Sequence, residues 1–289
     1  MLLLADVARH SVVISSGYTT AVRRYRLVPI LSLFIAVNAW AATVGETDRI
    51  LPLIQDGGGW STQVSITNLA AKPATVVAAF LTKRGFAEAW PVSLKSTAGT
   101  VKNATAEIPL APGATAIIET SGTPATLTRG FAEVAELADQ PIGVSATLIQ
   151  REGDLIIQSV KIPLAPAHER KSVVPFDLTD PLLKPQMIWV SMTSSKVLDV
   201  VFRNLRGETV LTDQISFDGS AQLTLNVRDY WPQLKEFRGT MQWSVTFPFA
   251  DRYEQRYLSG LSLLIREGQP WTVLNGMTLP ADQASISPY

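Results

Sequence analysis

The chain of 289 residues contains no cysteine, which excludes disulfides, thiolate metal sites, a cysteine nucleophile and a lipid-modified N-terminal cysteine. Histidine is nearly as scarce: there are two, and one of them, His168, lies in a polar segment between two strand-rich halves. A Ser-His-Asp arrangement needs a histidine held beside the serine, and zinc sites normally draw on several His or Cys ligands. The sequence therefore predicts a protein that is not an enzyme and that carries no metal or other cofactor.

The chain also has no excess of positive or negative charge. The 25 basic and 25 acidic residues balance, and neither kind gathers into a run. Phosphate binding relies on clustered Lys and Arg, so nucleic acid is not an expected partner. Acidic pairs such as Asp177 with Asp180 do not follow the spacing of a calcium loop, and we expect them to shape a turn before Pro181.

No stretch keeps a helical apolar period for three turns, whereas short runs rich in Val, Ile and Thr alternate with Gly, Pro, Asn and Asp. This pattern predicts an all-β protein. The expected strands are 49–54, 63–68, 74–82, 105–109, 114–119, 130–137, 142–150 and 155–163, then 171–175, 187–193, 197–204, 209–215, 221–226, 240–247, 258–266 and 271–279.

The N-terminus has the pattern of an export signal. Three arginines, the last of them Arg26, precede an apolar stretch at 27–37, and Ala39-Trp40-Ala41 fits a small-x-small cleavage pattern. We expect residues 1–41 to be a signal peptide that is removed after Ala41. The alternative is an uncleaved anchor over 27–45, which would be about the minimum length for a membrane span. Residues 1–21 are an unusual extension ahead of a signal peptide, and a translation start near Val22 would explain them.

Motifs recur in order along the chain, which predicts a duplicated domain with altered loops. The segment ending in Gly85 returns as the one ending in Gly207, and Arg129-Gly130 returns as Arg238-Gly239. We expect two tandem immunoglobulin-like β-sandwich domains, at 46–166 and 171–281, joined by a short linker that contains His168.

Three segments carry a resemblance to known proteins. The stretch 51–62 contains Gly57-Gly58-Gly59-Trp60, the stretch 110–114 reads Leu-Ala-Pro-Gly-Ala, and Val174-Pro175-Phe176-Asp177 opens the second half. Together they resemble predicted secreted bacterial tandem β-sandwich proteins of unknown function, with GGGW and APG turns. The resemblance implies an exported β-sandwich protein and brings no functional residues with it.

The candidate sites are few. Gly57, Gly58 and Gly59 lack the following helix and the lysine of a phosphate loop, so we expect a turn. Glu133 and Glu136 lie three residues apart on a predicted strand, where side chains face opposite ways, so we expect surface charge rather than a catalytic pair.

Aromatic residues in loops are the one positive indication of a binding site. Tyr230, Trp231 and Trp271 lie in loop-like sequence and are the candidate ligand-binding residues. Such rings can stack on sugars or anchor a protein partner, or they can fold back over a sandwich edge.

The sequence favours a secreted or periplasmic, non-catalytic interaction module, adhesion-like, that binds a protein or polysaccharide at the cell surface. The alternative is a carbohydrate-binding protein that uses those loop aromatics. A coplanar strip of exposed rings would favour sugar binding, whereas an apolar patch or an unpaired edge strand would favour a protein partner.

Overall fold

Alternation between apolar and polar residues produces strands along the whole described part of the chain. The computed structural model describes residues 49–96, 99–138, 140–166, 171–191, 196–217, 221–246, 258–266, 269–274 and 277–278. The predicted signal segment 1–41 and His168 with its linker lie outside these residues. The described part of the chain is all-β, with 71% strand and 4% helix, and none of its helical segments has the length and apolar character needed to cross a bilayer.

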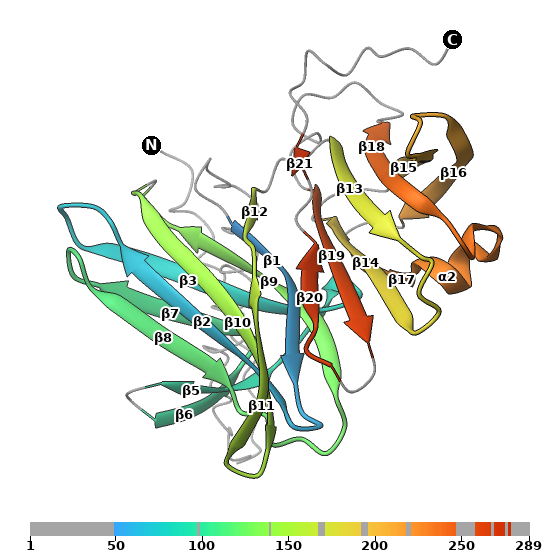
Figure 1. The fold of residues 1–289 in the computed structure, drawn as a ribbon. Helices are drawn as coiled ribbons and strands as arrows, with labels where there is room; N and C mark the ends of the chain where they lie inside the picture. Colours follow the sequence, from blue (N-terminus) through green and yellow to red (C-terminus); the bar gives the residue numbers. More distant parts are fainter. Residues whose placement is uncertain are drawn as a thin grey trace, which may run out of the picture. The chain divides into compact units, whose positions relative to one another are not determined.

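The first half of the chain, residues 49–166, contains twelve strands, β1 to β12 (Figure 1). They are β1 (Arg49–Asp56), β2 (Trp60–Asn68), β3 (Ala74–Thr82), β4 (Gly85–Ala89), β5 (Val92–Ser96), β6 (Gly99–Asn103), β7 (Thr105–Leu110), β8 (Thr115–Thr120), β9 (Thr128–Glu136), β10 (Ile142–Glu152), β11 (Leu155–Ile162) and β12 (Ala165–Pro166).

The second half, residues 171–278, continues with strands and two short helical turns. They are β13 (Lys171–Asp177), β14 (Leu183–Ser191), β15 (Lys196–Asn204), β16 (Thr209–Phe217), β17 (Ala221–Asn226), α2 (Val227–Tyr230), η1 (Pro232–Leu234), β18 (Arg238–Thr246), β19 (Leu258–Arg266), β20 (Thr272–Leu274) and β21 (Met277–Thr278).

Four antiparallel sheets result, two from each half. In the first half, sheet A has the order β12-β1-β9-β3-β4, with β7 also paired to β3, and sheet B has the order β11-β10-β2-β8-β5-β6. In the second half, sheet C has the order β17-β14-β19-β20 and sheet D the order β16-β15-β18-β13-β21. The strands therefore follow the same order in both halves, except that β4, β5 and β6 have no counterpart in the second.

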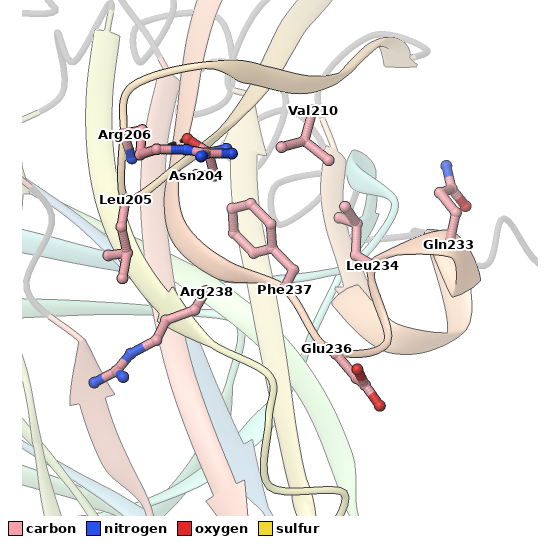
Figure 2. Close-up of a pocket in the computed structure, with 9 residues that line it drawn as sticks. All are labelled: Asn204, Leu205, Arg206, Val210, Gln233, Leu234, Glu236, Phe237 and Arg238. Atoms are coloured by element: carbon pink, nitrogen blue, oxygen red, sulfur yellow. Dashed lines mark hydrogen bonds between the residues drawn. The ribbon is translucent and has the colours of Figure 1, made fainter.

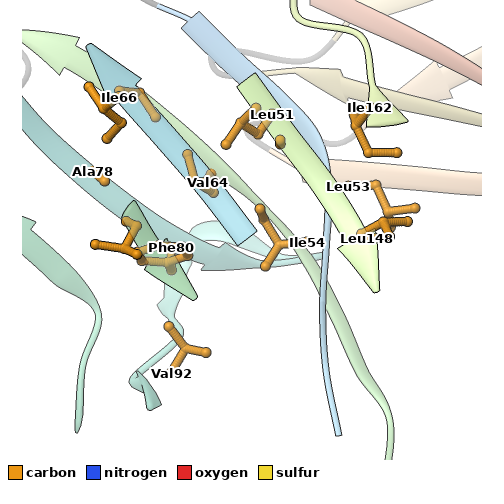
Figure 3. Close-up of a cluster of buried hydrophobic side chains, with 14 of the residues drawn as sticks. Leu51, Leu53, Ile54, Val64, Ile66, Ala78, Phe80, Val92, Leu148 and Ile162 are labelled. Atoms are coloured by element: carbon orange, nitrogen blue, oxygen red, sulfur yellow. The ribbon is translucent and has the colours of Figure 1, made fainter. Parts of the chain in front are cut away.

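Alternate residues of a strand point to opposite faces, and this explains where each core lies. Side chains of sheets A and B converge in one apolar cluster (Figure 3). Met187 and Trp189 of β14 face the cluster of the second half, whereas Ile188 between them packs into the cluster of the first. Val190 likewise packs with Phe131 of β9. Strands β1, β3 and β9 of sheet A, and the second half of β14 in sheet C, are thus buried on both faces.

The glycine turn forms as predicted. Gly57, Gly58 and Gly59 have φ values of 94°, 58° and 81°, a region that side chains with a Cβ rarely adopt. Gly57 and Trp60 exchange two backbone hydrogen bonds across the turn. The run of glycines is explained by backbone geometry, without a ligand.

One expectation was wrong: Glu133 and Glu136 are buried rather than surface charges. Both lie on β9, in the middle of sheet A, and this sheet is covered on both faces. The Glu136 Oε2 atom accepts hydrogen bonds from the backbone N–H groups of Ala138 and Gln140, at 2.8 and 2.6 Å. Glu136 therefore fixes the turn that follows its strand.

Candidate functional site

The three aromatic candidates do not form one platform, and Trp231 lies farthest from solvent. Its side chain is 2% exposed, and its ring meets the ring of Phe202 edge to face, with centroids 4.9 Å apart. The indole Nε1 donates a hydrogen bond of 2.8 Å to Asp213 Oδ2. A buried tryptophan normally has such a partner, so this residue closes the end of the second core.

Tyr230 and Trp271 have different neighbours. Tyr230 is 45% exposed and lies edge-on to Trp231. Trp271 is half-buried and packs on Trp60, with ring centroids 4.5 Å apart, and the Arg129 guanidinium lies 5.9 Å from its ring centroid. Desolvation by burial lowers the pKa of Arg129 from its ordinary value. Trp271 thus contacts the first half, whereas Tyr230 packs against the core of the second.

A surface hollow of about 430 Å³ lies on the second half (Figure 2). The residues that line it are Asn204, Leu205, Arg206, Val210, Gln233, Leu234, Glu236, Phe237 and Arg238. They come from two segments, the β15–β16 hairpin and the segment that leads from η1 into β18. Buried Phe237 and Leu234 form its floor, and Leu205, which is 73% exposed, stands at its rim with exposed Val210.

Asn204 shapes the hairpin side of the hollow. Its Oδ1 atom accepts hydrogen bonds from the backbone N–H groups of Arg206 and Glu208, at 2.9 and 3.1 Å. Gly207 supplies the left-handed position, with φ of 81°. An asparagine that bonds to the backbone two residues on is a common turn device. The turn leaves Leu205 at its tip, where the side chain points to solvent.

Arg228 fixes the backbone on the opposite side of the hollow. Its guanidinium donates to four backbone carbonyl oxygens, those of Leu178, Asp180, Leu183 and Lys235. Pro232 then begins η1, a position that suits a residue without an N–H group. The hydrogen bonds of Arg228 and the turn η1 fix the segment that leads from α2 into β18. Leu234 and Phe237 therefore point inward and form the floor of the hollow.

Charges of both signs surround this apolar floor. Arg206 pairs with Glu208 at 3.1 Å, and Arg238 pairs with Asp177 at 3.1 Å. Hydrogen bonds from the Thr179 hydroxyl and backbone N–H, together with the charge of Arg238, lower the pKa of Asp177. These pairs are exposed and therefore screened by solvent and salt. The lining offers a place for an apolar side chain with charged neighbours.

Clusters of metal-ligating side chains are not found in the described part of the chain. It contains no group of three or more His, Asp and Glu side chains that could hold a metal ion. Glu133 and Glu136 belong to the interior of a sheet, and Glu136 is already engaged by the turn that it fixes.

The sequence argument missed the residues of the hollow. It singled out the segments that end in Gly207 and begin at Phe237 only as repeated motifs. One signal was present: Leu205 lies between Asn204 and Arg206 in a hairpin turn, where a polar residue is usual. The opposite wall, residues 233–238, could not be predicted from sequence. It depends on the hydrogen bonds that Arg228 donates to carbonyl groups far apart in the chain.

Comparison with known proteins adds no relationship: no family model matches this chain, and no curated protein matches it.

Proposed function

We propose that the protein is an exported, non-catalytic interaction module that binds a protein partner at or outside the cell surface. The observation that carries this proposal is the hollow between residues 204–210 and 233–238, with its apolar floor and rim. An exposed leucine above a buried phenylalanine is typical of a surface that receives a partner side chain.

The expected ligand of the hollow is a peptide segment with one large apolar side chain. The floor that would receive this side chain is made by Leu234 and Phe237. The two arginines at the edge, Arg206 and Arg238, are already paired with Glu208 and Asp177, so the apolar contact rather than charge would select the ligand.

Carbohydrate binding is the weaker alternative. Sugar rings stack on exposed aromatic faces, and of the three candidates only Tyr230, at 45% exposed, is an exposed residue. Trp231 is enclosed in the core, and Trp271 is engaged by Trp60. A single exposed ring suits a protein surface better than a polysaccharide chain.

The two halves are, in this proposal, tandem immunoglobulin-like domains derived from one duplicated unit. The strand order that they share, apart from β4, β5 and β6, supports this. The registers support it too, because β3 and β9 pair Thr82 with Gly130, and β15 and β18 pair Asn204 with Gly239. These are the positions that the repeated sequence motifs equate.

Export rests on the N-terminal sequence pattern, with cleavage after Ala41 as the expected processing step. The absence of cysteine is compatible with this location, since each half buries a large apolar core and needs no disulfide to stabilise it.

Selection from a random peptide display library, with immobilised protein from residue 42 onward as bait, tests this function. We expect enriched peptides to share a large apolar residue, and to bind at least tenfold more weakly to Leu205→Asp and Val210→Asp variants. The matched control is Ile117→Asp, which changes an apolar residue on β8 that is about as exposed as Val210, at 50% against 52%.

Binding that is unaffected by the two hollow variants would overturn the assignment of the site. Saturable binding to a panel of polysaccharides, with no peptide enriched, would favour the carbohydrate alternative instead.

A further inference from the structure

Two neighbouring polar side chains of sheet A are enclosed without hydrogen-bond partners. Gln55 of β1 is 0% exposed, and neither its Oε1 nor its Nε2 atom has a partner among the described residues. Arg129 of β9 is half-buried, and its Nε atom is likewise enclosed and unpaired. Buried polar groups are nearly always hydrogen-bonded, so these three atoms need a physical explanation.

The register of the sheet places these two side chains next to each other. Gln55 lies directly opposite Arg129 in the antiparallel pairing of β1 with β9. Residues that lie opposite each other in such a pair point to the same face of the sheet. The ring of Trp271 lies over this face, with the Arg129 guanidinium 5.9 Å from its centroid. The three unpaired atoms therefore belong to one small region beside this ring.

The guanidinium has no counter-charge in this region. None of the salt bridges found in the described part of the chain includes Arg129. Glu133, the acid on the same face of β9, lies four residues away, about 13 Å along an extended strand. Burial lowers the pKa of Arg129, and no neighbouring carboxylate opposes this effect. A partly desolvated cation without a partner favours an anion at this place.

The chemistry of the unpaired atoms defines the group that would complete them. Arg129 Nε and Gln55 Nε2 are donors, whereas Gln55 Oε1 is an acceptor. Their complement is a negatively charged group with two acceptor oxygens and an N–H donor beside it. A chloride ion would supply the charge but no donor, and a water molecule would leave the charge unpaired. The C-terminal carboxylate of a peptide, with its last amide N–H group, has the full combination.

We propose that Arg129 and Gln55 bind the C-terminal carboxylate of a peptide chain. The carboxylate accepts from Arg129 Nε and from the Gln55 amide, and the last peptide N–H group donates to Gln55 Oε1. Charge-assisted hydrogen bonds to arginine are stronger than neutral ones, so the carboxylate supplies most of the affinity. The site shares no residue with the hollow of the second half, and the inference does not depend on what the hollow binds.

A ligand enters this site beside Trp271. Arg129 and Trp271 are both half-buried and reach the surface, whereas Gln55 is enclosed behind them. The backbone N–H group of Trp271 donates to Gln158 Oε1 at 2.9 Å, so the backbone is held and the ring is the part that moves aside. Because this ring stacks on Trp60, with centroids 4.5 Å apart, its movement changes the surroundings of two indoles. Binding is therefore expected to change the tryptophan fluorescence.

Thermal unfolding and tryptophan fluorescence of the protein from residue 42 onward test this site, with N-acetylglycine as a minimal peptide C-terminus. We expect the melting temperature to rise with the concentration of N-acetylglycine, because a ligand that binds only the folded state stabilises it. Acetate lacks the N–H group and N-acetylglycinamide lacks the charge. Each of these two compounds should therefore bind at least about tenfold more weakly than N-acetylglycine.

Three variants separate binding from folding. Arg129→Met keeps the aliphatic stem, removes the charge and should abolish the response to N-acetylglycine. The matched control is Arg84→Met, which removes an exposed arginine from the turn between β3 and β4 and should leave the response unchanged. Gln55→Glu places a carboxylate beside Arg129, so it should abolish the response while raising the melting temperature of the protein without ligand.

Three outcomes would overturn the proposal. The first is no change in melting temperature or fluorescence with N-acetylglycine at about 100 mM. The second is equal affinity for N-acetylglycine, acetate and N-acetylglycinamide. The third is a full response in folded Arg129→Met or Gln55→Glu protein, with circular dichroism as the check on folding.

Discussion

Trp271 of the second half stacks on Trp60 of the first, with ring centroids 4.5 Å apart. The contact joins the residue that closes the glycine turn to the segment that leads into β20. Gln222 makes a second link, because its Nε2 atom donates to the carbonyl oxygens of Pro52 and Gly130, at 2.7 and 2.9 Å. With Ile188 packed in the first core, these contacts make the boundary between the halves part of the folded interior.

The first prediction concerns this link. Trp271→Ala should lower the free energy of unfolding by about 2 kcal/mol, less than for a fully buried tryptophan because the ring is half-exposed. Urea unfolding followed by circular dichroism measures the change. Tyr230→Ala is the control, since it removes an exposed ring and should cost about 0.5 kcal/mol or less. Equal effects of the two substitutions would show that the stack contributes nothing.

The second prediction separates stability from ligand binding at Trp231. Trp231→Ala should destabilise the protein by about 3–5 kcal/mol, because it empties a core position and leaves Asp213 without its indole donor. Thermal unfolding would show the loss, and Trp231→Phe should recover part of it by refilling the space. An unchanged melting temperature for Trp231→Ala would mean that the ring is not buried in solution.

Strand positions were predictable from sequence because local alternation and turn residues define them. The strands Ala74–Thr82 and Leu258–Arg266 match their predicted bounds at both ends. Strands β4, β5 and β6, over 85–103, were missed because Gly, Ala, Ser and Lys interrupt their apolar pattern. Helix α2, with four residues, is too short to show a period.

The candidate site was less predictable, because burial depends on partners far along the chain. Tyr230-Trp231-Pro232 has the composition of an exposed loop, yet Trp231 finds Asp213 and Phe202 on other strands. Glu133 was expected on the surface because its sequence does not reveal that a second sheet covers sheet A. Sequence spacing describes which face a side chain takes, but not what lies against that face.

The third prediction uses two glycines at equivalent register positions. A Cβ atom at Gly130 would overlap the carbonyl oxygen of Leu81, and one at Gly239 would overlap that of Arg203. Because backbone atoms cannot move aside, Gly130→Ala and Gly239→Ala should each cost about 3 kcal/mol or more. Gly143→Ala is the control, with its nearest contact at an ordinary 3.5 Å from Leu69. Chemical denaturation measures all three, and a mild effect at only one of the first two positions would contradict the equivalence of the halves.

The fourth prediction concerns pH. Burial raises the pKa of Glu119, but hydrogen bonds from Ser61 and Arg151, with the charge of Arg151, outweigh it, so the net pKa lies below the ordinary value. The Arg151 Nη1 atom lies 2.7 Å from Glu119 Oε1. The unfolded chain therefore binds a proton more readily than the folded one. The stability from this group is fully present above the unfolded pKa of about 4.3 and is lost as pH falls through the folded value.

Glu119→Gln should thus cost about 1 kcal/mol at pH 7, a figure reduced for partial exposure, and less at pH 3. Urea unfolding at the two pH values gives the comparison. Glu208→Gln, which removes the carboxylate of an exposed ion pair with Arg206, should change stability little at either pH. If the cost of Glu119→Gln is the same at pH 3 and pH 7, the carboxylate charge does not stabilise the outer face of sheet B, and the contact acts only through shape and neutral hydrogen bonding.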